Sequence, residues 1–253
     1  MIESPRHFAG LNHLNMSKMR IFRHSALLLA LSVSLGSCLS TDDPLTGYGD
    51  AYVIVETSGQ DTLKGLGLHA FSYAEFSEVT ATAPGAAAGP YTLQAYLGYK
   101  QDFILETPRA EFTKSLPLAG TYLFSAKFTN GELLDFSNEL GIDYILPAVI
   151  KTAVYNTTGQ TVNVTWGSVL RANSFNVKLI DSDGKTLFLS PELNNSVDEF
   201  SIARDTQGWQ TSDLPAQGKT LTVEVAAYLK EKNSSMNRLQ CISRARTTVV
   251  WGQ

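Results

Sequence analysis

Short apolar runs, separated by Gly, Pro, Asn and Asp at intervals of about 8–12 residues, make up most of this sequence beyond residue 45. The clearest run is 121–128, in which Tyr122, Phe124, Ala126 and Phe128 alternate with Leu123, Ser125 and Lys127. Side chains alternate between the two faces of a strand, so this run predicts a strand with one aromatic, core-facing side. Other predicted strands cover 51–57, 91–97 and 132–136. A long helical period is absent from the sequence, and the pattern favours antiparallel β-sandwiches.

The chain length and composition fit two such sandwiches. There are 253 residues, of which 43% are apolar and 17% are charged, enough for packed cores. The segment 140–147 ends one set of runs and precedes another. We therefore predict an all-β fold of two tandem antiparallel β-sandwich domains, 48–141 and 142–253. Asn130-Gly131 predicts a hairpin with a type I′ turn, in which both central residues need positive φ.

The N-terminal segment has the order of a secretory signal. Lys18, Arg20 and Arg23 precede an apolar run, 26–35, that is too short to span a bilayer as a stable helix. The run ends in Leu35-Gly36-Ser37-Cys38, which resembles the lipobox of bacterial lipoproteins. The resemblance implies that 1–37 is a cleaved signal peptide, that Cys38 is lipidated, and that the membrane is a partner through this anchor.

Two features flank the lipobox. Residues 1–15 carry no basic cluster, and Met16 or Met19 is the more plausible start of translation. After the cysteine, 38–47 forms a polar tether in which Asp42-Asp43 resembles the surface-export signal of lipoproteins from Bacteroidota. The expected location is therefore the outer membrane, on the cell surface. A periplasmic-facing anchor with an ordinary acidic linker is the alternative.

The second half resembles a fibronectin type III domain. Residues 161–166, which end in Trp166, and 175–179 match the B and C strands of that family, while 214–227 and 243–251 match its E–F corner and its F and G strands. The resemblance implies that Trp166 is a core residue.

The E–F corner departs from the family. Leu221 stands where these domains usually carry a tyrosine. We therefore expect the corner to be held by packing instead of a phenolic hydrogen bond.

Charge and cysteine content exclude several classes of protein. The chain has 24 acidic and 20 basic residues, without the basic face that nucleic-acid binding requires, so no nucleic acid is predicted as a partner. There are two cysteines, and with Cys38 acylated Cys241 has no intrachain partner. In its strand context Cys241 is predicted to be a small buried apolar residue.

No catalytic or metal-binding motif stands out, and the chain is not predicted to be an enzyme. His69 is the only histidine after residue 37, and neither a nucleophile elbow nor a phosphate-binding loop is present. Asp198 and Glu199 are adjacent, and on a strand they would point to opposite faces, which disfavours a glycosidase pair. Asp181-Ser182-Asp183-Gly184 resembles the start of a calcium loop, but a plain hairpin turn is favoured. No cofactor and no metal is predicted.

Exposed aromatic side chains are the candidate ligand contacts. Trp209 lies among polar residues and Tyr96 is expected on the outer side of its strand. Flat aromatic rings on a surface are typical of sugar-binding faces, although the pattern favours the alternative that Trp209 caps the sandwich edge. Asp61-Thr62-Leu63 resembles the O-glycosylation acceptor of exported Bacteroidota proteins, which predicts modification of Thr62.

These features together predict a non-catalytic binding or adhesion module that contacts polysaccharide at the cell surface. The alternative is a structural scaffold or accessory subunit of an envelope protein assembly.

Overall fold

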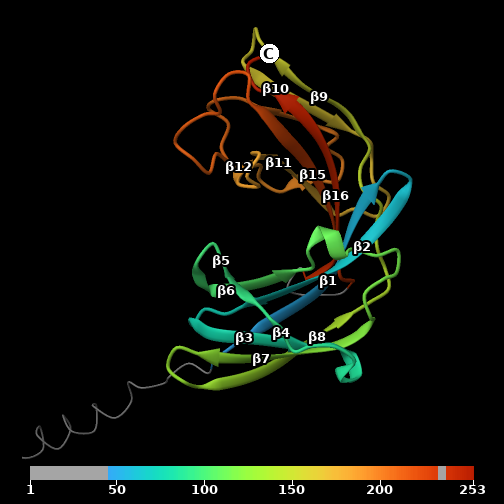
Figure 1. Cartoon of the computed structure of the whole chain (residues 1–253), viewed down its shortest axis with the longest axis vertical. Helices are drawn as coiled ribbons and strands as arrows, with labels where there is room; N and C mark the ends of the chain where they lie inside the picture. The colour runs from blue at the N-terminus through green and yellow to red at the C-terminus, as the bar shows by residue number, and fades with distance from the viewer. Residues whose placement is uncertain (1–44, 233–237) are drawn as a thin grey trace, which may run out of the picture. The chain divides into compact units, whose positions relative to one another are not determined.

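The computed structural model describes residues 45–232 and 238–253, and this part of the chain is almost entirely β (Figure 1). Cys38, the signal segment 1–37 and most of the tether lie outside the described residues. Within the described part, no helix has the length and apolar character needed to cross a membrane. The strands are β1 (Tyr48–Ser58), β2 (Asp61–Phe71), β3 (Phe76–Thr82), β4 (Tyr91–Thr92), β5 (Gln94–Tyr96), β6 (Tyr99–Glu106), β7 (Gly120–Phe128), β8 (Leu133–Leu140), β9 (Ile150–Asn156), β10 (Thr161–Trp166), β11 (Ser174–Ile180), β12 (Thr186–Leu189), β13 (Leu193–Asn194), β14 (Glu199–Ile202), β15 (Thr220–Lys230) and β16 (Leu239–Val250).

The first sandwich is formed by β1 to β8. One sheet contains the order β1-β2-β6-β5, and the other has the order β4-β3-β7-β8. If the strands are lettered A to G along the chain, with β4 as C′, the two sheets have the orders A-B-E-D and C′-C-F-G. These are the sheets of an immunoglobulin-like Greek key. The alternation predicted for 121–128 is confirmed, because Tyr122, Phe124, Ala126 and Phe128 are all buried.

The second sandwich is formed by β9 to β16. Its small sheet has the order β14-β10-β9, and the facing strands follow the order β12-β11-β15-β16. This is the A-B-E and C′-C-F-G arrangement of a fibronectin type III-like domain. Trp166 is fully buried with its ring centroid 5.7 Å from that of Phe175, as the family resemblance implied. Leu221 is also buried, so the E–F corner is held by packing.

A single sheet runs through both sandwiches. β16 pairs with β15 on one side and with β1 on the other, so nine strands share one hydrogen-bonded sheet (Figure 1). The β1–β16 pairing is parallel and sets Val53 opposite Cys241 and Glu56 opposite Arg244. Parallel neighbours need a long connection, which here is the rest of the chain between them.

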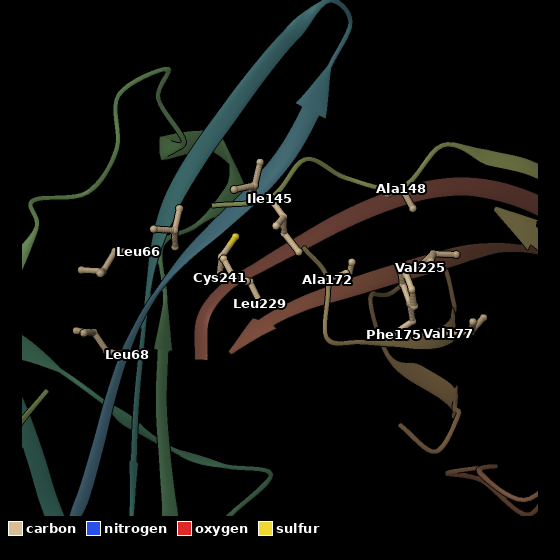
Figure 2. Close-up of a cluster of buried hydrophobic side chains, with 14 of the residues drawn as sticks. Leu66, Leu68, Ile145, Ala148, Ala172, Phe175, Val177, Val225, Leu229 and Cys241 are labelled. Carbon is tan, nitrogen blue, oxygen red and sulfur yellow. The ribbon is translucent and has the colours of Figure 1, made fainter. Parts of the chain in front are cut away.

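The hydrophobic core follows this joined sheet. One cluster of buried side chains extends from Ala51 to Trp251 and includes residues of both sandwiches. Around β1 and β16 it contains Leu66 and Leu68 of β2, Ile145 of the 141–149 connection and Cys241 (Figure 2). The side chains on the two faces therefore alternate along β1, with Val53 and Val55 facing this core and Tyr52 and Ile54 facing a smaller apolar cluster on the opposite face.

Three local features differ from the sequence-based expectations. Only Gly131 of the Asn130-Gly131 pair has positive φ, so the β7–β8 hairpin forms without a type I′ turn. Both residues of Leu97-Gly98 have positive φ, and this pair makes the β5–β6 turn, which the sequence analysis did not single out. The expected strand 91–97 is divided into β4 and β5, which pair with different sheets.

Candidate binding site

The joined sheet carries two adjoining pockets on the face opposite the main core. They share His69, Tyr228 and Leu239 as lining residues. The first, which we name the aromatic pocket, has a volume of about 670 Å³ and is lined also by Tyr48, Asp50, Phe71, Tyr73, Asn176, Glu192, Lys230 and Arg238. The second, which we name the charged pocket, has a volume of about 590 Å³ and is lined also by Tyr52, Tyr96, Asp102, Glu106, Lys178, Glu224, Arg244 and Arg246. Both volumes lie in the range of small-molecule sites. Both pockets use strands of both sandwiches, so the site depends on the β1–β16 pairing.

Three aromatic rings follow one another along the aromatic pocket. Tyr48 and Phe71 are opposite each other in the β1–β2 register, and their rings are stacked with centroids 6.4 Å apart. Tyr73 follows with its ring edge-on to Phe71 at 5.3 Å, and Tyr73 is 79% exposed. The row therefore presents a ring to solvent that is supported from behind by two others.

Asp50 is a buried acid in the same pocket. It is 9% exposed, and its Oδ2 accepts a 2.8 Å hydrogen bond from the backbone N–H of Leu239. Its Oδ1 is buried and has no hydrogen-bond partner among the described residues. Burial raises the pKa of Asp50 to about 7, against the opposing effect of the Leu239 N–H, and the charge of Glu231 adds to the rise. An orphaned acceptor of this kind calls for an explanation, because leaving a buried polar atom unpaired is costly.

His69 marks the boundary between the two pockets. Its Nε2 lies 2.7 Å from Asp102 Oδ1, and both side chains are about one-third exposed. Among the described residues that line the two pockets there is no Ser, Thr or Cys to serve as a nucleophile beside His69.

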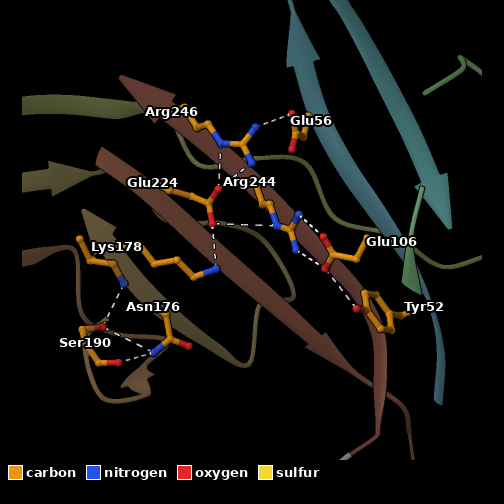
Figure 3. Close-up of polar contacts among 10 residues, drawn as sticks. Tyr52, Glu56, Glu106, Asn176, Lys178, Ser190, Glu224, Arg244 and Arg246 are labelled. Carbon is orange, nitrogen blue, oxygen red and sulfur yellow. Dashed lines mark hydrogen bonds and ion pairs between the residues drawn. The ribbon is translucent and has the colours of Figure 1, made fainter. Parts of the chain in front are cut away.

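Alternating charges fill the charged pocket (Figure 3). Arg244 donates two hydrogen bonds to Glu106, of 2.8 and 2.5 Å, and the Tyr52 hydroxyl donates to the same carboxylate at 3.2 Å. Glu224 is reached by Lys178 at 3.1 Å and by Arg246 at 2.7 Å. The network thus ties β1 and β6 of the first sandwich to β11, β15 and β16 of the second.

The electrostatic balance keeps Glu106 and Glu224 ionised. Burial raises the pKa of Glu106, but hydrogen bonds and charge from Arg244 outweigh it and leave the pKa below its ordinary value. Burial of Glu224 is likewise outweighed by Lys178, Arg244 and Arg246. Neither carboxyl has the raised pKa that a general acid requires at neutral pH.

A glycine shapes the floor between the pockets. Gly67 of β2 lies opposite Tyr52 in the β1–β2 register, and a Cβ on Gly67 would overlap the Tyr52 ring. The ring can therefore lie flat across the neighbouring strand, which brings its hydroxyl to Glu106.

The structure separates the two aromatic candidates from the sequence. Tyr96 is 45% exposed and lines the charged pocket. Trp209 is half-buried far along the second sandwich: its indole N–H donates to the Ala203 carbonyl at 2.9 Å and its ring packs edge-on to Phe188 and Trp251. Trp209 thus caps the core and does not form an exposed platform. Burying the ring against apolar side chains at the edge of the sandwich is more favourable than leaving it in solvent.

The remaining sequence candidates lie away from the pockets. Thr62 lies near the start of β2 opposite Thr57. Cys241 is fully buried, and burial raises the pKa of its thiol to about 12, which confirms the prediction of a small apolar residue. Asp181 Oδ1 accepts the backbone N–H groups of Asp183 and Lys185, as expected for the favoured hairpin turn.

Sequence reasoning missed Asp50, Phe71 and Tyr73. The signal was present in part, since Phe71 and Tyr73 alternate with Ala70 and Ser72 directly after His69, a strand-like pattern that places both rings on one face. Their grouping with Tyr48 depends on the β1–β2 register.

The strand order defines this chain as a tandem immunoglobulin-like and fibronectin type III-like β-sandwich protein, with two pockets on the sheet that joins the sandwiches. No family model and no curated protein matches the sequence. Among solved structures, the chain is similar to a two-domain fibronectin type III segment of chicken tenascin, with 12% identity over 80% of this chain and 99% of that one and a TM-score of 0.28.

Two structures from adhesion proteins are similar at the same level. A tetra-tandem repeat from the extending region of a large adhesion protein has 18% identity over 80% of this chain and 50% of that one, with a TM-score of 0.26. The adhesin domain of Epf from Streptococcus pyogenes has 14% identity over 81% and 77%, with a TM-score of 0.27. At these scores the assignment of the fold rests on the strand order described above.

Proposed function

We propose that this chain is a non-catalytic binding module that holds a glycan in the aromatic and charged pockets. The observation that carries the proposal is the row Tyr48, Phe71 and Tyr73 beside the buried carboxyl of Asp50. Pyranose rings present apolar C–H faces and hydroxyl edges, and a site for them combines flat aromatic surface with a few fixed polar groups.

The support behind the pockets favours binding without rearrangement. The floor is a hydrogen-bonded sheet whose outer side chains are held by ion pairs such as Arg244–Glu106. A site on strands that is fixed in this way loses little conformational entropy when a ligand binds.

The test is a binding screen with a matched pair of tyrosine variants. Tyr73→Ala removes the exposed ring of the row, whereas Tyr99→Ala removes a tyrosine that is 64% exposed and lines neither pocket. Calorimetric titration with neutral, anionic and amino-sugar oligosaccharides should show binding by the wild type and Tyr99→Ala, with at least a tenfold loss for Tyr73→Ala. Equal affinity in both variants rejects the pocket as the site, and release of reducing ends rejects the non-catalytic role.

The proposed cellular location rests on the lipobox resemblance. We propose that Cys38 is lipidated and anchors the chain in the outer membrane of a bacterium of the Bacteroidota, with the sandwiches on the cell surface. Protease shaving of intact cells, with lysed cells as the control, tests the orientation. Cleavage only after lysis rejects surface display.

A scaffold or accessory role in an envelope protein assembly is the second candidate. The observation that favours it is the exposed β5–β6 turn, where Leu97 is 77% exposed next to Tyr99. Crosslinking in intact membranes followed by purification distinguishes the two roles, because a scaffold predicts a defined partner whose recovery is lost in Leu97→Ser.

A further inference from the structure

We propose that the aromatic pocket selects an uncharged carbohydrate, which it recognises through a ligand hydroxyl that donates a hydrogen bond to Asp50 Oδ1. This inference rests on the proposed function and names the ligand class for the same site. It starts from the orphaned oxygen, which belongs to a side chain only 9% exposed and lines the pocket beside the aromatic row.

The second oxygen of Asp50 fixes the carboxyl in place. Oδ2 accepts the Leu239 N–H at 2.8 Å, so the group cannot turn to bring Oδ1 to another partner without giving up that bond. None of the described residues donates to Oδ1, and Asp50 lines the pocket, so we assign the missing donor to a ligand bound there.

Charge pairing in the pocket argues for a neutral donor. Lys230 Nζ lies 2.8 Å from Glu192 Oε1 and His69 Nε2 lies 2.7 Å from Asp102 Oδ1, so both groups already face a carboxylate. Arg238, which also lines the pocket, is not free either. An anionic sugar would have to break such a pair and would also meet Asp50. A hydroxyl satisfies Oδ1 without disturbing either pair.

The hydrogen bond from the ligand to Asp50 is coupled to the release of a proton. Burial holds the pKa of Asp50 near 7, with Glu231 raising it and Arg238 lowering it from the β15–β16 hairpin. His69 is opposite Asp50 in the β1–β2 register, and the Lys230–Glu192 pair lies in the same pocket. A donated hydroxyl favours the carboxylate, so binding below pH 7 releases the proton of Asp50 to the buffer and weakens as the pH falls.

The experiment is a calorimetric titration of the full chain at pH 6 and pH 8. The probes are hexasaccharides of neutral sugars (cello-, malto-, xylo- and mannohexaose), oligogalacturonate as the anionic probe and chitosan hexamer as the cationic one. We expect a neutral probe to bind the wild type about tenfold more tightly at pH 8 than at pH 6. Asp50→Asn should lower the affinity at pH 8 roughly tenfold or more and remove the pH dependence.

Asp50→Asn is a close control because the amide keeps an oxygen for the Leu239 N–H and leaves His69 unchanged. Any pH dependence that persists in this variant belongs to another group and overturns the inference. Titration of the wild type in two buffers with different ionisation enthalpies measures the proton release directly, so the inference is tested even where the variant fails to fold. Absence of proton release at pH 6 overturns it.

The outcomes separate the inference from the proposed function. Neutral-probe binding that is lost in Tyr73→Ala but equal in Asp50→Asn at pH 8 overturns the role of Asp50 and leaves glycan binding in place. Binding of the anionic or cationic probe alone overturns the assigned ligand class. Binding of none of the probes overturns both proposals.

Discussion

Arg246 Nη1 donates a 2.9 Å hydrogen bond to Glu56 Oε2, and the two residues are 190 positions apart in the chain. Glu56 also meets Arg109 at 2.8 Å, and its side chain is only 6% exposed. The bond crosses from β16 to β1, where the two sandwiches share their sheet. Charge pairing and strand pairing therefore hold the same junction.

Arg244→Ala is expected to lower the free energy of unfolding strongly. Arg244 is 12% exposed and contacts Glu106 and Glu224, so its removal leaves two half-buried or buried carboxylates short of a cation. Breaking a buried ion pair in this way costs about 3–5 kcal/mol. Urea denaturation measures the loss. Arg109→Ala, which removes a 62% exposed cation from Glu56, should cost under about 1 kcal/mol, and equal losses in the two variants contradict this account.

The same network should make the protein sensitive to acid. The pKa values of Glu106 and Glu224 are lowered in the folded chain. The unfolded chain therefore binds protons first as the pH falls, so the stabilisation is present above the ordinary glutamate pKa of 4.5 and is lost as the pH drops through the lowered values. Glu106→Gln should thus differ most from the wild type near pH 7, and the gap should narrow toward pH 3. A gap that does not change with pH contradicts the ion pair as its cause.

Asp50→Asn is expected to have the opposite pH dependence. The unfolded chain loses its proton near the ordinary pKa of 3.8, whereas folded Asp50 keeps its proton until about pH 7. Between these values the folded state binds more protons, so wild-type stability falls as the pH rises through this range, by up to about 4 kcal/mol. The variant lacks this loss and should be more stable than the wild type at pH 8 but similar near pH 4. Thermal unfolding across this range measures it, with the exposed Asp183→Asn as a control that should follow the wild type.

Tyr122→Phe tests the corner of the first sandwich. Tyr122 is buried at the start of β7, the F strand, and its hydroxyl donates to the Leu118 carbonyl at 3.0 Å, four residues upstream. This is the arrangement of a tyrosine corner. Loss of the hydroxyl should lower the free energy of unfolding by about 1 kcal/mol. Tyr99→Phe, which alters an exposed side chain, should leave the free energy of unfolding unchanged. If the midpoint of urea denaturation is also unchanged in Tyr122→Phe, the hydroxyl of Tyr122 does not stabilise the corner.

The thiol of Cys241 should resist labelling in the folded protein. Cys241 is fully buried opposite Val53, and its raised pKa keeps it protonated at neutral pH. Ellman's reagent should therefore react with a soluble form that lacks Cys38 only after denaturant is added. Rapid labelling of the native protein would show that the β1–β16 pairing opens readily.

Local patterns predicted the fold well and the site poorly. The aromatic alternation of 121–128 and the core position of Trp166 follow from strand periodicity and the family resemblance. The parallel pairing of β1 with β16 does not, because no local pattern specifies a partner 190 residues away.

Asp50 shows the same limit for the site. The expected strand began at residue 51, one residue after Asp50, and no local pattern marked this acid. Its burial arises from the β15–β16 hairpin, whose Leu239 N–H reaches it from the other end of the chain.

The β1–β16 ladder has a mechanical consequence. β1 is the first described strand after the tether, and it is hydrogen-bonded along its length to β2 and, from Val53 to Glu56, in parallel to β16. With the anchor proposed at Cys38, a pull between the membrane and a ligand held in the pockets would enter the fold through β1. The load would run along the strand, so the ladders on both sides would have to shear together instead of opening one bond at a time. The strand that joins the two sandwiches would also be the one that resists force.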